Sequence, residues 1–301
     1  MEIESPNLSH IARPTGPKAS GAGNGRAEQG ALRSGSARSV LLTVLGELVE
    51  PAGQPVWTSS LLYVLNGMGF EEQAARQAID RAGDAGWMTG TRRGRNVRWE
   101  LTGTGRDLIG AGARRIHSLG PPRAPWKGEW LILLVSLPGN RRAVRKRLYA
   151  ALSWAGFGNP TPGVWLSPHP DRAAEVATVI DELGVADTAL AFVGRSAAIG
   201  MDDRTVVARS WQLGELAARY EAVVETLRGR RPRAGDRLLF AHLRLVNQMQ
   251  RFPFLDPQLP EELLGEWIGR RATELFERRR DAWTAGAHQR WREVVELTAP
   301  A

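Results

Sequence analysis

The 301-residue sequence contains no cysteine and only three lysines, Lys18, Lys127 and Lys146. The absence of cysteine excludes a disulfide framework, a thiolate nucleophile and a cysteine-ligated zinc or iron–sulfur centre. No apolar run approaches the ~20 residues of a membrane helix, and the polar N-terminus lacks the apolar stretch of a signal peptide. We therefore expect a cytoplasmic protein that neither spans nor crosses a membrane.

The length of the chain indicates more than one domain. A single ordinary core is formed by about 100 to 150 residues, so 301 residues predict two or three domains. Apolar residues make up 43% of the chain and charged residues 24%, which is close to the average of soluble proteins. Most of the chain can therefore bury a core.

The charge balance is basic and rests almost entirely on arginine. Forty basic residues face 32 acidic ones, which gives a net charge of +8, and all but three of the basic residues are arginines. Guanidinium groups bind phosphates and guanine edges in a forked geometry, so this balance suits a polyanionic partner. An arginine-rich genome explains this balance equally well. Only the positions of the arginines along the chain can distinguish the two interpretations.

Residues 1–36 differ from the rest of the chain in composition. They mix glycine, serine, proline and alanine with few large apolar side chains, as in the stretch PTGPKASGAGNGRAEQG. Such a segment cannot bury enough apolar surface to offset the entropy of ordering, so we predict a disordered arm.

Residues 37–118 predict a winged helix-turn-helix domain. Their apolar spacing and turn residues indicate three helices, a hairpin and a closing helix, at about 37–50, 58–67, 71–85, 87–101 and 101–117. In a winged helix-turn-helix domain the third helix enters the major groove of DNA and the hairpin lies along the backbone.

Two groups of polar side chains are the candidate DNA-binding residues of this domain. Those on the third helix, which can form the paired bonds that identify guanine or adenine, are Gln73, Arg76, Gln77 and Arg81. Those near the tip of the hairpin, which we expect to bind phosphates, are Arg92, Arg93, Arg95 and Arg98. The alternatives are a solvated helix face and a module that binds protein instead of DNA.

A proline-rich linker at 119–128 separates this domain from an α+β domain at 129–211. Strands are predicted at 130–137, 164–166, 188–193 and, as a fourth, 205–211, with helices between them. This alternation indicates a ferredoxin-like fold. The chain from 212 to 301 reads as helices only, with apolar stripes at 216–227, 238–249, 263–276 and 283–297.

The central domain offers candidate effector-binding residues. A basic run on its first helix includes Arg141 and Arg145, which could bind phosphates or extend a DNA footprint. The aromatic residues Trp126, Trp130 and Trp165 could wall a pocket for an aromatic ligand. A solvated helix face and an ordinary core are the respective alternatives.

No enzymatic site emerges from the sequence. The five histidines are scattered without the close pairing of zinc sites, so no metal is predicted. No nucleophile elbow, Ser-His-Asp order or paired-carboxylate motif is present either. We predict no catalytic residue and no cofactor.

Several short strings are similar to those of one family. The head has RQAIDR running into GWM at Arg76 to Met88, and the central domain begins WKGEW at Trp126 to Trp130, followed by GFG and GVW. The C-terminal part has DPQLPEELL at Asp256 to Leu264 and WIGRRA at Trp267 to Ala272. Over residues 37–280 the chain resembles the PaaX family, the repressors of phenylacetate-catabolism operons.

The resemblance implies a homodimeric transcriptional repressor that binds a palindromic operator. It also implies release from DNA by an aryl-acyl-CoA, with phenylacetyl-CoA as the effector of the best-known members. The chain departs from the family pattern at Asn247-Gln248, where a His-Glu pair is expected, so the ligand could differ.

The central domain of the family is also similar in fold to a CRISPR-associated nuclease that has a metal-binding aspartate at the end of its first strand. Here that strand ends Val135-Ser136-Leu137, without a carboxylate. We expect a DNA-binding repressor; a regulator answering another ligand and a nucleic-acid-processing enzyme are the alternatives.

Overall fold

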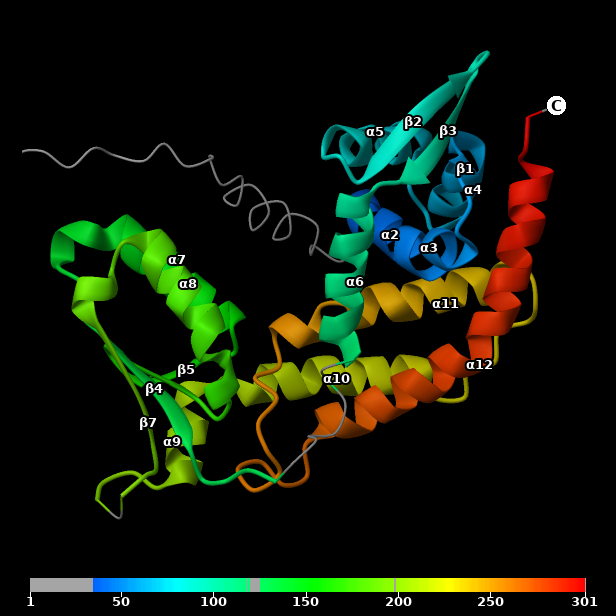
Figure 1. The fold of residues 1–301 in the computed structure, drawn as a ribbon. Coiled ribbons are helices and arrows are strands. Elements are labelled where there is room, and N and C mark those ends of the chain that lie inside the picture. The colour runs from blue at the N-terminus through cyan, green and yellow to red at the C-terminus, as the bar shows by residue number, and fades with distance from the viewer. Residues whose placement is uncertain (1–34, 118, 120–124, 198, 301) are drawn as a thin grey trace, which may run out of the picture.

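A computed structural model describes residues 35–117, 119, 125–197 and 199–300 (Figure 1). The predicted arm lies outside the described residues up to residue 34, as do residues 120–124 of the predicted linker. The architecture is mixed α+β, with helical N-terminal and C-terminal parts and a central sheet domain to one side of them (Figure 1). None of the helices in the described ranges is long and apolar enough to cross a bilayer.

The N-terminal part, here called the head, contains the predicted helices and hairpin. Its helices are α2 (Ala37–Val44), α3 (Glu50–Ala52), α4 (Thr58–Gly67), α5 (Glu72–Asp84) and α6 (Gly103–His117). A π-helical turn, Leu45–Val49, joins α2 to α3. Strands β1 (Val56–Trp57), β2 (Met88–Arg93) and β3 (Asn96–Leu101) form an antiparallel sheet in the order β1-β3-β2.

The hydrophobic core of the head includes side chains from the C-terminal helices. Leu41, Leu45 and Leu61 are fully buried at its centre. The same apolar cluster includes Leu243 of α11 (Asp236–Met249) and Trp291 of α12 (Ile268–Leu297). The head therefore sits on the C-terminal helices as part of one packed unit (Figure 1).

The central domain is a four-stranded antiparallel sheet with two helices on one face. The strands are β4 (Trp130–Val135), β5 (Gly158–Thr161), β6 (Val164–Ser167) and β7 (Ala189–Gly194), in the order β5-β6-β4-β7. Helices α7 (Arg142–Trp154) and α8 (Ala173–Leu183) cover the face to which Leu131, Leu133 and Val135 point. Strand β5 was not predicted, because Gly158 and Pro160 conceal it in the sequence.

The strand predicted at 205–211 is wrong, because this segment forms helix α9 (Asp203–Ser210). The β-branched residues of the segment favour a strand, but Asp202 caps a helix: its side chain accepts a hydrogen bond from the Thr205 backbone N–H at 2.8 Å. Val206 and Val207 of this helix pack with Trp130 on the second face of the sheet.

The C-terminal part consists of α10 (Leu213–Leu227), α11 and α12, which lie against one another (Figure 1). The two last helices predicted from the sequence are a single 30-residue helix, α12, and Leu263 and Leu264 precede it in a turn. Gly286 does not interrupt α12. It allows close packing instead, since a Cβ there would lie 2.5 Å from the Cδ2 atom of Leu238.

The string that begins at Asp256 builds the turn between α11 and α12. The buried Asp256 carboxylate accepts hydrogen bonds from Tyr220 Oη at 2.8 Å, Trp267 Nε1 at 3.0 Å and the Gln258 backbone N–H at 2.7 Å. Burial and this neighbouring carboxylate raise the pKa of the Tyr220 hydroxyl, so it stays a donor. The string is thus explained by folding of the turn.

Candidate nucleic-acid interface

Helix α5 separates an apolar face from a polar face because its small side chains recur at helical spacing. Ala75, Ala78, Ile79 and Ala82 are buried against the rest of the head, and the short side chains let the helix lie close to its neighbours. All four predicted contact residues of this helix are exposed on the opposite face: Gln73, Arg76, Gln77 and Arg81.

The guanidinium group of Arg76 has a partner on its own helix. It donates to Glu72 Oε1 at 2.9 and 2.7 Å, and the two side chains are 54% and 60% exposed. A solvent-exposed ion pair of this kind contributes little stability, typically below about 1 kcal/mol. Arg76 can therefore exchange Glu72 for an anionic ligand at small cost.

The hairpin β2–β3 is fastened to α5 by Trp99. A Cβ at Gly83 of α5 would lie 2.9 Å from this ring, and one at Gly90 of β2 would lie 3.0 Å from it. Trp99 Nε1 also donates to Thr58 Oγ1 at 2.9 Å, which ties the hairpin to α4. Gly94 turns the chain at the tip with a φ of 59°, a left-handed value that favours glycine.

The four predicted arginines of the hairpin are all exposed, but they do not share one face. Arg92 pairs with Val97 in the ladder, so it lies on the same face as Trp99. Arg93 and Arg98 lie on the opposite face, and Arg95 stands in the turn. Arg98 also lies over the Trp57 ring, 5.6 Å from its centroid. The structure thus divides the predicted cluster between two faces and a tip.

Sequence reasoning missed Arg38, on the first turn of α2. Its guanidinium carbon lies 4.5 Å from the centroid of the Trp87 ring. Burial and the nearby positive charge of Arg81 lower the pKa of Arg38. Two like charges held near each other make a local positive potential that an anion would relieve. Only the fold reveals this pair, because 43 residues separate the two arginines.

A second missed group of arginines lines a hollow of about 460 Å³ around the segment that joins α10 to α11. The arginines are Arg230, Arg231, Arg233, Arg237 and Arg244. The signal in the sequence was the run RGRRPRAGDR at 228–237, which has five arginines in ten residues.

The predicted effector residues are only partly brought together. The Trp126 and Trp130 rings lie 5.2 Å apart, edge to face, but Trp165 packs on the other face of the sheet, against Tyr149 at 4.9 Å. Trp130 Nε1 donates to Asp203 at 3.0 Å, and Trp130 is buried in the core. These three tryptophans therefore do not wall a common pocket.

The two predicted arginines of the central domain lie at the start of α7. Arg145 donates to the backbone oxygens of Leu137 at 2.6 Å and Pro138 at 3.1 Å, so it holds the chain where β4 ends. Arg141 is half-buried in the short helix before α7. Among the described residues, no group of three or more His, Asp or Glu side chains could hold a metal ion.

The head and the C-terminal helices are connected by a joint, the set of contacts around Glu47 in the π-helical turn. The carboxylate of Glu47 accepts two hydrogen bonds from Arg280 of α12, at 3.2 and 2.9 Å, and lies 2.9 Å from Nε2 of the fully buried His242 of α11. His288 Nε2 lies 2.7 Å from the Glu47 backbone oxygen. Burial raises the pKa of Glu47, but the bonds from His242 and Arg280 outweigh it and lower the pKa to about 2.

A second joint lies nearby. Asn247 Nδ2 of α11 donates to Ser39 Oγ at 2.8 Å and Thr43 Oγ1 at 3.0 Å, both on α2. Asn247 belongs to the Asn-Gln pair at which the sequence departs from the family pattern. In this chain the residue therefore helps to hold the head.

Comparison with known proteins agrees with the resemblance. Family models match three consecutive segments: a PaaX-like protein at 36–105, the PaaX protein central Cas2-like domain at 123–206 and the PaaX-like protein C-terminal domain at 206–293. The transcriptional repressor PaaX of Escherichia coli (strain K12) is 31% identical over 255 residues, which are 80% of this chain and 78% of that protein.

Among solved structures, the uncharacterized protein Rv0674 from Mycobacterium tuberculosis matches with a TM-score of 0.58 and 19% identity. The match covers 86% of this chain and 98% of that one. At this identity the likeness concerns the fold alone. The family models and the 31% identity to the repressor from Escherichia coli lead to one conclusion: the chain belongs to the PaaX family.

Proposed function

We propose that the chain is a DNA-binding transcriptional repressor. The observation that carries this proposal is the pairing of α5, with four exposed polar side chains on one face, with a hairpin that carries four exposed arginines. The repressor that is 31% identical supports the same assignment. A solvated surface needs no such concentration of positive charge. Binding to DNA phosphates is strengthened by it, because the arginines release counterions from the DNA.

The two parts of the interface have different tasks. As a winged helix-turn-helix, the head places α5 in the major groove, where Arg76, Gln77 and Arg81 reach base edges and Gln73 assists at the start of the helix. The hairpin follows the backbone, and its four exposed arginines, which divide between two faces and the tip, are the candidate phosphate ligands. Arg38 adds charge beside Arg81.

We assign residues 37–118 to the winged helix-turn-helix, 119–128 to a linker, 129–211 to a ferredoxin-like domain and 212–301 to a helical domain. The order of elements β4-α7-β5-β6-α8-β7 and the sheet order β5-β6-β4-β7 support the ferredoxin-like assignment. A nuclease function finds no support at the end of β4, where Val135, Ser136 and Leu137 supply no carboxylate for a metal.

Regulation of this repressor requires an effector that releases it from DNA and a dimer that fits a palindromic operator. We assign the role of effector to an aryl-acyl-CoA such as phenylacetyl-CoA, which releases the protein by preferring the state that does not bind DNA. A homodimer fits a palindromic operator, because one head reads one half-site. The exposed side chains of Leu190 and Phe192 on the edge strand β7, 61% and 53% accessible, offer a surface for self-association.

Fluorescence anisotropy tests the proposal on the purified chain. A labelled duplex from upstream of its own gene is compared with a scrambled duplex at fixed salt, and phenylacetyl-CoA is then titrated into the complex. We expect tight binding of the first duplex and its reversal by the thioester. Specific binding that every acyl-CoA leaves intact would keep the repressor and discard the effector, and equal binding of both duplexes would exclude the repressor.

A further inference from the structure

The hollow of about 460 Å³ beside the segment that joins α10 to α11, here called the arginine hollow, concentrates positive charge. Its arginines are all exposed, and among the described residues none of them forms an ion pair with a carboxylate. Like charges that are held close together repel one another, and an anion relieves this repulsion. The five residues are Arg230, Arg231, Arg233, Arg237 and Arg244.

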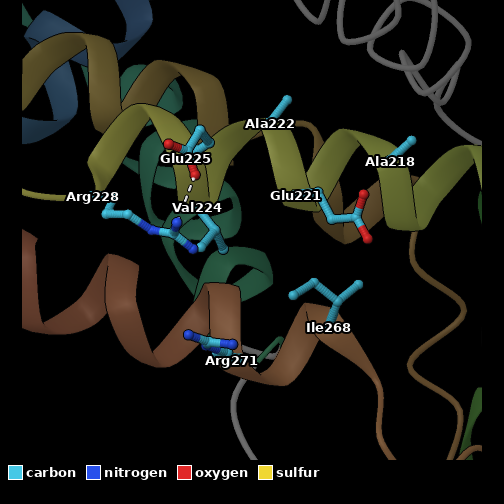
Figure 2. A pocket seen from close by; sticks show the side chains of 8 residues that line it. All are labelled: Ala218, Glu221, Ala222, Val224, Glu225, Arg228, Ile268 and Arg271. Atoms are coloured by element: carbon cyan, nitrogen blue, oxygen red, sulfur yellow. Dashed lines mark ion pairs between the residues drawn. The ribbon is translucent and has the colours of Figure 1, made fainter.

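A second hollow, between α10 and α12, has a volume of about 520 Å³ and is lined by charges of both signs (Figure 2). Glu221 and Glu225 balance Arg228 and Arg271 there, and Glu225 pairs with Arg228 at 3.3 Å. The lining of this hollow is therefore neutral and does not favour an anion. The comparison shows that an excess of positive charge is a property of the arginine hollow and not of every hollow along α10.

The segment that carries most of these arginines, residues 228–237, contains one carboxylate, and this carboxylate is engaged elsewhere. Asp236 accepts hydrogen bonds from Tyr63 Oη of α4 at 2.9 Å and from Arg290 Nε of α12 at 2.8 Å. It therefore fixes the segment to the head and to α12 instead of neutralising the arginines beside it.

The arginine hollow also borders the turn between α4 and α5. Phe240, which lines the hollow, packs so closely on Gly67, the last residue of α4, that a Cβ at Gly67 would clash with the ring. Arg244 Nη2 lies 3.5 Å from the backbone oxygen of the same glycine. Residues 68–71 then lead into α5. The position of the hollow relative to α5 is thus held by contacts through α4.

The chemistry of the arginine hollow fits the phosphates of a duplex. Guanidinium groups bind phosphate oxygens in a forked geometry. Double-stranded DNA presents one negative charge per about 1.7 Å of its axis, so it engages several guanidinium groups of one surface at once. Five exposed arginines without ion-pair partners in the described part of the chain therefore fit a repeated anion better than a single one.

We propose that the arginine hollow binds phosphates of the DNA that flanks the half-site held by α5. The inference rests on the proposed function, because the ligand is the duplex on which the head is bound. The hollow gives the C-terminal helices a direct contact with DNA. This contact adds affinity without sequence preference, since phosphates carry no sequence information.

Two triple variants that each remove three positive charges provide the test. The hollow variant changes exposed side chains of the connecting segment: Arg230→Gln, Arg231→Gln and Arg233→Gln. The control variant changes exposed side chains of α7 in the central domain: Arg142→Gln, Lys146→Gln and Arg147→Gln. Because all six side chains are exposed, both variants should keep the midpoint of chemical denaturation of the unchanged chain.

Fluorescence anisotropy at several salt concentrations measures the contact on a duplex from upstream of the gene and on the same duplex shortened stepwise from both ends. On the longest duplex the hollow variant should reduce the slope of log affinity against log salt by about 1 to 3 for each bound chain, since one phosphate contact contributes about 0.9. This difference should disappear as the flanks are removed. The control variant should match the unchanged chain at every length.

Three outcomes of the salt series would overturn the proposal. The first is an equal slope for the hollow variant and the unchanged chain on the longest duplex. The second is an equal reduction in the control variant, which would indicate a general effect of net charge. The third is a reduction that shortening leaves intact, which would place the contact inside the half-site.

Two further arms separate this inference from its alternatives. The salt series is repeated on scrambled duplexes: equal affinity for both sequences would remove the proposed function, while the slopes would still report whether the hollow binds DNA phosphates. Isothermal titration of ATP into the DNA-free proteins tests a free polyphosphate as the ligand. ATP binding that the hollow variant lacks, together with equal slopes on DNA, would assign the hollow to a free nucleotide and overturn the proposal.

Discussion

The arginines of the molecule fall into two sets with different surroundings. On α5 and the hairpin they are exposed, and Arg76 shares only a surface pair with its own helix. At the joint between head and C-terminal helices they are bonded to partners from other elements: Arg280 to Glu47, and Arg290 to Asp236 at 2.8 Å and to Tyr63 Oη at 3.1 Å. The two sets have the same chemistry and differ in the supply of acceptors.

This difference shows why the net charge alone could not locate the interface. Where the fold supplies carboxylates, a guanidinium group becomes part of the joint. The hydrogen bonds that Arg290 donates to Asp236 and Glu293 raise the pKa of Arg290. Where the fold supplies none, the guanidinium group is left for a ligand from outside.

The largest effect is expected at the joint. Glu47→Ala leaves the fully buried His242 and the half-buried Arg280 without their carboxylate, and removing one partner of a buried pair costs about 3 to 5 kcal/mol. Chemical denaturation measures the loss. The control is Glu225→Ala, which breaks the exposed pair with Arg228 and should cost less than about 1 kcal/mol. Equal losses of stability in the two variants would mean that the contacts of Glu47 contribute no more than an exposed ion pair does.

The Glu47 carboxylate should also make the free energy of unfolding depend on pH. The pKa of Glu47 is lowered from 4.5 to about 2, so as pH falls the unfolded chain takes up the proton first. Its contribution, on the order of 3 kcal/mol, is complete above about pH 5 and is lost as pH falls toward 2. Denaturation of the unchanged chain and of Glu47→Gln at pH 6 and pH 3 measures it. The difference between the two proteins should shrink at pH 3, and a constant difference would contradict the assignment.

The contrast between the two sets also explains what the sequence could and could not reveal. The buried alanines of α5 follow the helical period and the residues of β2 and β3 alternate about a glycine-bearing turn, so the helix and the hairpin could be predicted from the sequence. The joint could not, because Glu47 and Arg280 are 233 residues apart and nothing local distinguishes them from solvated residues. Strand β5 and helix α9 were missed where local propensity conflicts with pairing or capping.

On the exposed set, α5 should determine which sequence is bound. Arg81→Ala removes a candidate base contact, and a paired contact to a base contributes about 1 to 3 kcal/mol of discrimination, or roughly 5- to 150-fold in affinity. Anisotropy on operator and scrambled duplexes should show the operator affected far more than the scrambled DNA. An equal loss on both would mean that Arg81 binds phosphate, and Gln77→Ala would then be the next candidate for base contact.

The smallest effect should come from the hairpin, and it should be uniform. Arg93→Ala removes one candidate phosphate contact, so it should weaken both duplexes alike and reduce the slope of log affinity against log salt by about 1. Arg142→Ala on α7 is the control, since this exposed arginine lies in the central domain, away from the head. If Arg142→Ala lowers the slope as much as Arg93→Ala does, the central domain shares the DNA surface. If only Arg93→Ala lowers it, the position of an exposed arginine decides its role, as it does for the arginines of the joint.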